Sequence, residues 1–517
     1  TNKKPKGGFI MLRQMPKQLS FHTSLYNKIP KNHILKTIKD TVDFSFINEL
    51  LADSYCKNFG RPAKEPALMC KLLFLQAMYG QSDEKLIEDA NLNLAYLYFL
   101  DLNPEDELPE ASLLSKFRTT RLQEYTLDEI ITEIVRQCVE KGIIKCDSVS
   151  IDATHIEANT IRKTPERLMK HLARNIIKEY TEETFEPLEN IPDEPEYKEI
   201  EDHKEAKKVM KTYLETVIEE AEKSLTNETT GTKKAIDKAK EIISDPKFIN
   251  QKGVRSLVDE DARVGRKSKN KDFFGYKSEF VMTTDERIIT SVRTSHGAYI
   301  DGTYAGEMLE DTKKAGIDLK EVYGDKAYFR KAILDVIRGS NAQAYIPVSG
   351  VVYRIDEEEF SYNKDSDEWQ CSEGNLTVNK KYFTSQTKKG DREGYKYYFE
   401  MGQCKSCPKH DECAKKSARK ILVIGLNTNE FYEISQYQKT DEFKEKYKKR
   451  ASIEGKNAEL KRFHGLCRAK GYGLKSVSKQ AKLAAIAVNL KRIAAIISSF
   501  PANFIQNIFT FKVIFGF

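Results

Sequence analysis

The chain contains 517 residues, of which 40% are hydrophobic and 32% are charged, and its formal net charge at pH 7 is +7. A chain of this length is too long to fold around one hydrophobic core, so we expect about three domains. No segment reaches the roughly 18 uninterrupted apolar residues of a membrane-spanning helix, so we expect no membrane association. The first residues carry charge without the apolar stretch of a secretory signal, and we therefore expect an intracellular protein.

The positive charge is concentrated in two blocks near the ends of the chain. Residues 1–39 contain nine Lys or Arg and no acid, and residues 439–492 contain sixteen Lys or Arg against five acids. Two separated basic blocks suit a polyanion that is bound in two places, because Lys and Arg release counterions from phosphates. A solvated basic tail is the alternative for the first block.

Helix signals dominate the first 140 residues. The apolar run 66–79 predicts a helix that ends at Gly80, and Ser82 predicts the N-cap of a second helix, which gives a helix-turn-helix spacing. A third helix, capped around Ser112, presents a broad basic surface. DNA recognition and a solvated basic edge both account for this surface. Its residues are Lys116, Arg118 and Arg121.

Two carboxylates stand at the ends of predicted strands. The alternation from Ser148 to Asp152 indicates a short strand that ends at the acid. Asp325 follows a second apolar stretch and Gly324, where a strand gives way to a helix. Open sheets place their chemistry at strand ends, so both acids are candidate catalytic residues.

A third carboxylate lies on a predicted helix near the C-terminus. Tyr447, Arg450, Glu454 and Lys461 recur at offsets of three, seven and fourteen, and at about 100° per residue they fall within roughly 60° of one helix surface. Such a stripe alone is ordinarily a solvated ion-pair face. Together with the two upstream acids, however, it gives three carboxylates, which suffice to hold two divalent ions for phosphoryl transfer.

The motif YKKRASIEGKNAELK, with IDATHIEAN around the first acid and GDKAY at the second, resembles a known family. It is similar to bacterial insertion-sequence transposases with a DDE triad and a Y-R-E-K signature on a ribonuclease-H-like fold, and the resemblance covers most of the chain. It implies that Asp152, Asp325 and Glu454 are catalytic and hold two Mg²⁺ or Mn²⁺ ions. It also implies that Tyr447, Arg450 and Lys461 contact DNA phosphates.

The same resemblance implies a function and partners. The expected activity is binding of the terminal inverted repeats, followed by strand cleavage and strand transfer in cut-and-paste transposition. The expected partner is double-stranded DNA, bound by a homodimer in the bacterial cytoplasm at the nucleoid. Two alternatives remain at this stage: a metal-dependent nuclease of the same fold, and a catalytically dead DNA-binding derivative.

The expected fold class is an α/β ribonuclease-H-like catalytic core, a mixed sheet flanked by helices, with an all-α N-terminal domain and two insertions. Residues 275–284 and 287–294 predict a strand pair in this core. Arg266 and Lys267, just upstream, either follow a DNA backbone or belong to a flexible loop. The predicted domains are a helical DNA-binding domain at 1–140, a catalytic domain at 141–350 together with 431–500, a helical insertion at about 163–247 within it, a β-rich insertion with cysteines at 350–430, and a tail at 501–517.

The β-rich insertion contains a cluster of cysteines. Cys404, Cys407 and Cys413 lie within ten residues of one another, and Cys371 lies upstream in the same insertion. Structural zinc takes four ligands, so Cys371 or His410 would complete the set. C-x-x-C alone is a modest signal, and free thiols in a reducing cytoplasm are the alternative.

Overall fold

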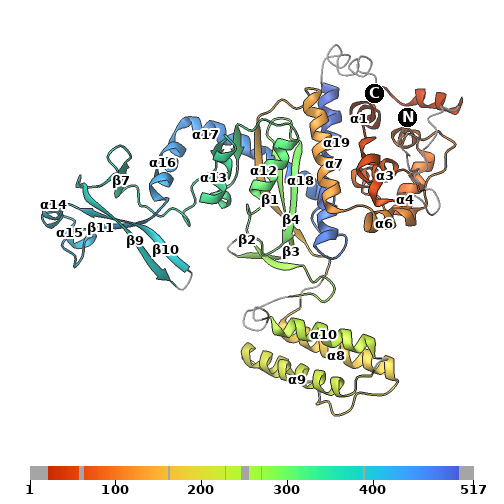
Figure 1. The fold of residues 1–517 in the computed structure, drawn as a ribbon, viewed down its shortest axis with the longest axis horizontal. Coiled ribbons are helices and arrows are strands. Elements are labelled where there is room, and N and C mark those ends of the chain that lie inside the picture. The colour runs from red at the N-terminus through yellow and green to blue at the C-terminus, as the bar shows by residue number, and fades with distance from the viewer. Residues whose placement is uncertain are drawn as a thin grey trace, which may run out of the picture.

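The structure, a computed structural model, describes residues 21–56, 63–160, 163–226, 229–245, 248, 255–268, 270–387 and 390–499. A mixed sheet lies in the middle of the molecule (Figure 1). The N-terminal helices and the last helix cover one side of it, and a small β-rich unit extends on the other. Three further helices project below the sheet in this view. The predicted tail at 501–517 lies outside the described residues.

The N-terminal region consists of short helices, as its sequence predicts. The helix predicted at 66–79 is α3; Gly80 ends it in the left-handed conformation with φ of 69°, which glycine adopts without steric cost. The predicted N-cap at Ser82 is confirmed, because its side chain accepts a hydrogen bond from the Lys85 N–H at 3.1 Å. The helices, with 3₁₀ segments marked η, are η1 (Phe21–Lys28), α1 (Ile34–Thr41), α2 (Phe46–Leu50), η2 (Ala52–Ser54), α3 (Pro66–Tyr79), α4 (Asp83–Leu92), α5 (Leu94–Phe99), α6 (Ala111–Thr120) and α7 (Glu124–Glu140).

The cap predicted at Ser112 is wrong. Helix α6 begins at Ala111, and its N-cap position is Glu110, whose side chain makes no cap hydrogen bond. Ser112 already lies inside the first turn, and its hydroxyl lies 3.5 Å from the Glu110 carboxylate. A serine within the first turn therefore cannot mark the start of the helix.

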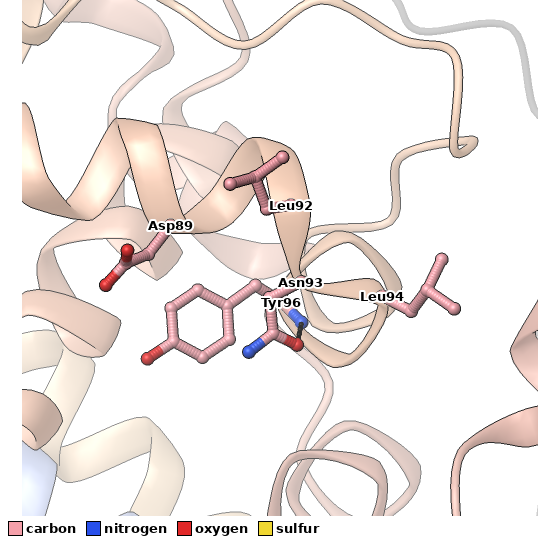
Figure 2. Close-up of a pocket in the computed structure, with 5 residues that line it drawn as sticks. All are labelled: Asp89, Leu92, Asn93, Leu94 and Tyr96. Carbon is pink, nitrogen blue, oxygen red and sulfur yellow. Dashed lines mark hydrogen bonds between the residues drawn. The ribbon is translucent and has the colours of Figure 1, made fainter.

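The α4–α5 junction forms a surface hollow (Figure 2). Asn93 caps α5, because its Oδ1 accepts a hydrogen bond from the Ala95 N–H at 2.9 Å. Leu92, beside it, is 82% exposed. Asp89 is the one acid among the residues that line the hollow, so this feature lacks the set of carboxylates that the sequence predicts for a catalytic site.

The central sheet has six strands in the order β2-β3-β1-β5-β6, and β4 also pairs with β3. Strands β2, β3, β4 and β1 pair in antiparallel fashion, whereas β5 runs parallel to β1 and β6 runs parallel to β5. The strand pair predicted around 285 is the β3–β4 hairpin. The strands are β1 (Ser148–Glu157), β2 (Arg263–Ser268), β3 (Lys271–Thr283), β4 (Ile289–His296), β5 (Glu321–Tyr323) and β6 (Gln343–Tyr345).

Strands β1 and β3 approach closely at Gly275. A Cβ atom at this position would lie 2.1 Å from the Ile156 carbonyl oxygen, a distance that no side chain tolerates. Glycine therefore permits the β1–β3 ladder to continue to its end, where Glu157 pairs with Gly275.

Helices complete the core and link the sheet to the N-terminal region. The last helix, α19, contacts α1, α3 and α7 on one side and β4 on the other. Its buried Asn489 bonds both backbone groups of Ile289, at 2.8 and 2.7 Å, which joins the helix to the strand. The helices of this part are α12 (Ala305–Lys314), η4 (Lys326–Tyr328), α13 (Lys331–Gly339), α16 (Thr428–Lys439), α17 (Asp441–Tyr447), η5 (Lys448–Arg450), α18 (Ala451–Phe463) and α19 (Leu474–Ser499).

Two insertions interrupt the core. The first consists of α8 (Pro165–Thr184), η3 (Tyr197–Glu199), α9 (His203–Lys223) and α10 (Thr230–Ser244), and these helices enclose a hydrophobic cluster of their own. The long amphipathic helix predicted here is α9, which buries Met210, Leu214 and Val217. The second contains β7 (Phe360–Asn363), β8 (Glu368–Cys371), β9 (Thr377–Thr387), β10 (Gly390–Phe399), α14 (Met401–Lys405), α15 (His410–Cys413) and β11 (Ile421–Gly425).

None of the described helices is long and apolar enough to cross a membrane.

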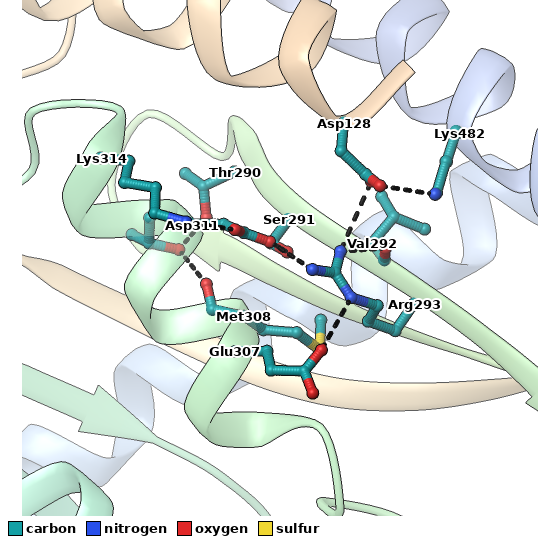
Figure 3. Close-up of polar contacts among 11 residues, drawn as sticks. Asp128, Thr290, Ser291, Val292, Arg293, Glu307, Met308, Asp311, Lys314 and Lys482 are labelled. Carbon is teal, nitrogen blue, oxygen red and sulfur yellow. Dashed lines mark hydrogen bonds and ion pairs between the residues drawn. The ribbon is translucent and has the colours of Figure 1, made fainter. Parts of the chain in front are cut away.

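A network of ion pairs connects four elements at the centre of the molecule (Figure 3). Arg293 on β4 lies 2.6 Å from Asp311 on α12 and 3.4 Å from Asp128 on α7. Lys482 on α19 bonds the same Asp128 at 2.8 Å. Burial raises the pKa of Asp128, and the charges of Lys482 and Arg293 oppose that shift. One guanidinium thus holds together two half-buried acids that would otherwise repel each other.

We expect Arg293→Ala to lower the free energy of unfolding by about 2 kcal/mol, because it removes the nearest cation from the half-buried Asp311 and leaves Asp128 with Lys482 as its cationic partner. Urea denaturation of the full chain measures this change. Lys314→Ala is the matched control: Lys314 also pairs with Asp311, at 3.7 Å, but its side chain is 70% exposed. Its loss should cost less than about 0.5 kcal/mol. Equal effects of the two substitutions would contradict a central role for Arg293.

Candidate active site

Asp152 lies on β1, the strand between β3 and β5. Its neighbour across the antiparallel ladder is Phe280, and its side chain is half-buried. Asn457 on α18 donates a hydrogen bond from Nδ2 to Asp152 Oδ2 at 2.9 Å. A contact across 305 positions of the sequence therefore fixes α18 against the acid.

Asp325 lies just beyond the end of β5. Strand β5 pairs with β1, the strand that carries Asp152. Ser150 pairs with Tyr323 in the parallel β1–β5 ladder, and each acid follows two residues after its member of that pair. The two carboxylates therefore leave adjacent strands at the same level. Asp325 caps the η4 turn, because its Oδ1 accepts a hydrogen bond from the Ala327 N–H at 2.8 Å. This bond fixes one oxygen of the side chain.

Glu454 lies in the first turn of α18, and its side chain is 61% exposed. Arg450, one turn earlier, donates to Glu454 Oε1 from Nη1 at 2.8 Å. The predicted single helical stripe is interrupted, because residues 448–450 form the 3₁₀ segment η5 between α17 and α18. The tighter turn changes the phase of Tyr447 relative to Glu454, while the spacing between Arg450 and Glu454 is preserved.

The three acids influence one another electrostatically. Burial, together with the negative charges of Asp325 and Glu454, raises the pKa of Asp152 to about 7, and the positive charge of Arg450 opposes this shift. The charges of both other acids thus affect the pKa of Asp152, although these acids come from distant parts of the sequence. A carboxyl with this pKa is partly protonated at neutral pH.

Several buried polar atoms around this site have no hydrogen-bond partner among the described residues. They include Arg450 Nε and Asn457 Oδ1, beside two serine hydroxyls, those of Ser150 and Ser452. Buried polar atoms are ordinarily paired, so unpaired atoms on the segments that carry the acids indicate a missing ligand or water.

Oxygen donors of this kind suit Mg²⁺ or Mn²⁺. As their side chains lie, no group of three or more His, Cys, Asp or Glu in the described part of the chain is close enough to hold a metal ion. Glu454 is instead paired with Arg450. The donor set therefore fits divalent ions in its chemistry, and binding would require Glu454 to exchange its partner.

Lys461 lies at the other end of α18. Its Nζ is 3.1 Å from His155 Nδ1, and His155 lies on β1 beyond Asp152. Burial lowers the pKa of both groups, that of His155 to about 4, and Lys267 adds a like charge to each. His155 is therefore neutral at pH 7, and the lysine is the donor in this pair.

The remaining candidate DNA-binding residues lie in different settings. Tyr447 stacks on Phe443, with ring centroids 5.7 Å apart. Arg266 and Lys267 are exposed on β2, and Arg266 lies 3.6 Å from Asp272. Both residues belong to a strand, so the alternative of a flexible loop is wrong for them.

The basic surface predicted on α6 is not fully open. Lys116 is exposed. Arg118, in contrast, donates to Asp83 Oδ1 at 2.8 Å and to Gln76 at 3.0 Å. Arg121 donates to the Ser54 carbonyl oxygen and lies over the Tyr55 ring, 4.7 Å from its centroid. Two of the three predicted cations thus make contacts inside the N-terminal region.

Sequence reasoning missed Asn457. It lies three residues after Glu454, so the helical spacing alone places it near the same face, but an amide carries no charge to draw attention. Its hydrogen bond to Asp152 depends on how α18 packs against β1, which the sequence does not specify.

Two family models match parts of the chain. Residues 23–120 match a family described as a transposase domain (DUF772), and residues 370–494 match one described as a transposase DDE domain. The second match includes Glu454, whereas Asp152 and Asp325 lie outside both matched segments. Together the two matches support an insertion-sequence DDE transposase, an enzyme that acts on DNA. No curated protein and no solved structure matches the chain.

The raised pKa of Asp152 predicts how stability depends on pH in a metal-free buffer. Between pH 4 and 7 the folded state keeps a proton that the unfolded chain releases, so the wild type loses stability as the pH rises. Asp152→Asn removes this loss, and its stability relative to the wild type should increase by on the order of 2 kcal/mol from pH 4 to 8.

Urea denaturation with a chelator at both pH values measures the effect. Asp441→Asn is the control, because the Asp441 side chain is 96% exposed. A relative stability of Asp152→Asn that does not change with pH would contradict the raised pKa.

Proposed function

We propose that the chain is a cut-and-paste transposase that binds the terminal inverted repeats of its insertion sequence and catalyses DNA strand cleavage and strand transfer. One observation carries the proposal: Asp152 and Asp325 follow the paired residues Ser150 and Tyr323 of adjacent parallel strands, and α18, the helix of Glu454, is hydrogen-bonded to Asp152 through Asn457. The antiparallel strands followed by the parallel strands β5 and β6 support a ribonuclease-H-like core.

Asp152, Asp325 and Glu454 would hold two Mg²⁺ or Mn²⁺ ions. Like-charged acids in a partly desolvated site repel one another, and a divalent cation removes that repulsion. When bound, two such ions activate the attacking oxygen and stabilise the departing 3′ oxygen. The chain's own residues supply positioning and charge around them.

Arg450 would bind a DNA phosphate. Its Nη1 donates to Glu454, and its Nε is buried and has no hydrogen-bond partner among the residues that the structure describes. Release of Glu454 would free the guanidinium, whose planar fork suits two phosphate oxygens. We infer that the same movement completes the acidic site and exposes the phosphate ligand.

Asn457 and His155 act as positioning residues in this proposal. Asn457 fixes one oxygen of Asp152, which leaves the other available. Neutral His155 accepts a hydrogen bond from Lys461 and so keeps the ammonium group of Lys461 beside β1. Lys461, with Tyr447, would contact the backbone of the transposon end.

Other basic residues would bind DNA away from the acids. Lys116 is accessible on α6 for recognition of the inverted repeats, while Arg118 and Arg121 would first have to leave their present partners. Arg266 and Lys267 on β2 would follow a DNA backbone by charge alone. Because transposition joins two transposon ends, we propose that a homodimer assembles on the DNA.

We expect Asp325→Asn, and likewise Asp152→Asn and Glu454→Gln, to reduce strand cleavage below detection while binding to transposon ends remains within about threefold of wild type. Cleavage and strand transfer of a labelled end, beside a binding titration, separate these effects. Glu445→Gln is the control, because its side chain is 70% exposed. Normal cleavage by Asp325→Asn would overturn the assignment of the acids, and cleavage without joining by the wild type would indicate a nuclease.

We expect Asn457→Leu to lower both cleavage and Mn²⁺ affinity by about 10- to 100-fold, the usual effect of removing a residue that orients a metal ligand. Leucine has a similar volume but cannot donate to Asp152. Isothermal titration with Mn²⁺ measures the affinity without DNA. Unchanged Mn²⁺ affinity in a folded Asn457→Leu protein would show that Asn457 does not orient Asp152.

A further inference from the structure

Four of the nine cysteines line one cavity in the β-rich insertion. Cys371 ends β8, Cys404 lies on α14, Cys407 follows it, and Cys413 ends α15. The fold therefore brings cysteines from three separate segments to one cavity. Lys409, His410 and Lys420 line the same cavity.

The segment that carries three of these cysteines has almost no hydrophobic core. Between residues 401 and 420, Cys404 is the one buried residue. Helices α14 and α15 have five and four residues, which is too short for stability by helix formation alone. Segments with so little buried apolar surface are ordinarily held by a disulfide or a metal ion.

Backbone hydrogen bonds bend this segment around the cavity. The His410 N–H donates to the Cys407 carbonyl oxygen at 3.0 Å, and His410 Nδ1 lies 2.7 Å from the Cys404 carbonyl oxygen. Lys420 Nζ donates to the Cys413 carbonyl oxygen at 3.2 Å. These bonds hold the two short helices with their cysteines on the cavity side, although they supply little apolar burial.

The four thiols influence one another electrostatically. Burial raises the pKa of Cys413, Lys420 lowers it, and Cys371, Cys404 and Cys407 each raise it, so all four thiols lie within electrostatic reach. Of the two lysines at the cavity, Lys409 pairs with Glu373 at 3.0 Å, which also lines it, so Lys420 is the cation that would offset part of the negative charge of a four-thiolate centre. All nine cysteines are free thiols, so no disulfide cross-links the segment.

We propose that Cys371, Cys404, Cys407 and Cys413 bind a structural Zn²⁺ ion that stabilises the segment 401–420, in which little apolar surface is buried. Four sulfur ligands favour zinc over the oxygen-preferring ions expected at the acidic site. As the side chains lie, no group of three ligands in the described residues is close enough to hold an ion. Zinc binding would therefore require the cysteine side chains to change rotamer so that their sulfurs converge on the shared cavity.

The test is the metal content of the full chain, purified under reducing conditions without chelator and measured by mass spectrometry. The wild type should carry one zinc ion per chain, and Cys407→Ser and Cys413→Ser should lose it. Cys56→Ser is the matched control, because Cys56 is exposed and lies in the N-terminal region. Asp152→Asn should keep its zinc, so this readout is independent of the proposed transposase activity.

Co²⁺ titration of the metal-free wild type covers the case in which a cysteine variant does not fold. Thiolate-to-cobalt charge-transfer absorption is expected on binding, and its absence, with no zinc in the purified chain, would overturn the proposal. Cys371→Ser and His410→Asn identify the fourth ligand. Loss of zinc from His410→Asn, with retention in Cys371→Ser, would replace the four-cysteine set by three cysteines and a histidine and so contradict the set proposed.

Discussion

The parallel pairing of β1 with β5 is the constraint on which the candidate active site depends. Because Ser150 pairs with Tyr323, Asp152 and Asp325 leave neighbouring strands at one level. Glu454 lies on α18, and the Asn457–Asp152 hydrogen bond fixes this helix against β1. A shift of one residue in the β1–β5 register would turn one of the two acids to the opposite face of the sheet.

The rest of the core maintains this pairing. The ion pairs of Arg293 connect β4 with α7 and α12, and Asn489 joins α19 to the edge of β4. The N-terminal helices, the sheet and α19 share one hydrophobic cluster, whereas the three helices of the first insertion have their own. The first insertion is therefore a separate unit, whereas buried residues of the second insertion, among them Trp369 and Phe399, belong to the cluster that contains the sheet.

Local signals made much of this arrangement predictable. The apolar run before Gly80 and the cap at Ser82 specify α3 and α4 by themselves, because each signal acts within one turn. Periodicity could not reveal the 3₁₀ segment at 448–450, because three residues are too few to define a helical period of their own. The inward contact of Arg118 and the role of Asn457 were missed for another reason: both depend on partners that folding brings from elsewhere in the chain.

The central claim is that Asp152, Asp325 and Glu454 jointly bind divalent ions. The most direct measurement is anomalous scattering from crystals of the chain grown with Mn²⁺ and a cleaved transposon end. The account predicts manganese peaks between the three carboxylates, with Glu454 released from Arg450 and the guanidinium on a DNA phosphate. Manganese bound elsewhere, or an ordered DNA complex in which Glu454 stays paired with Arg450 away from the two aspartates, would contradict it.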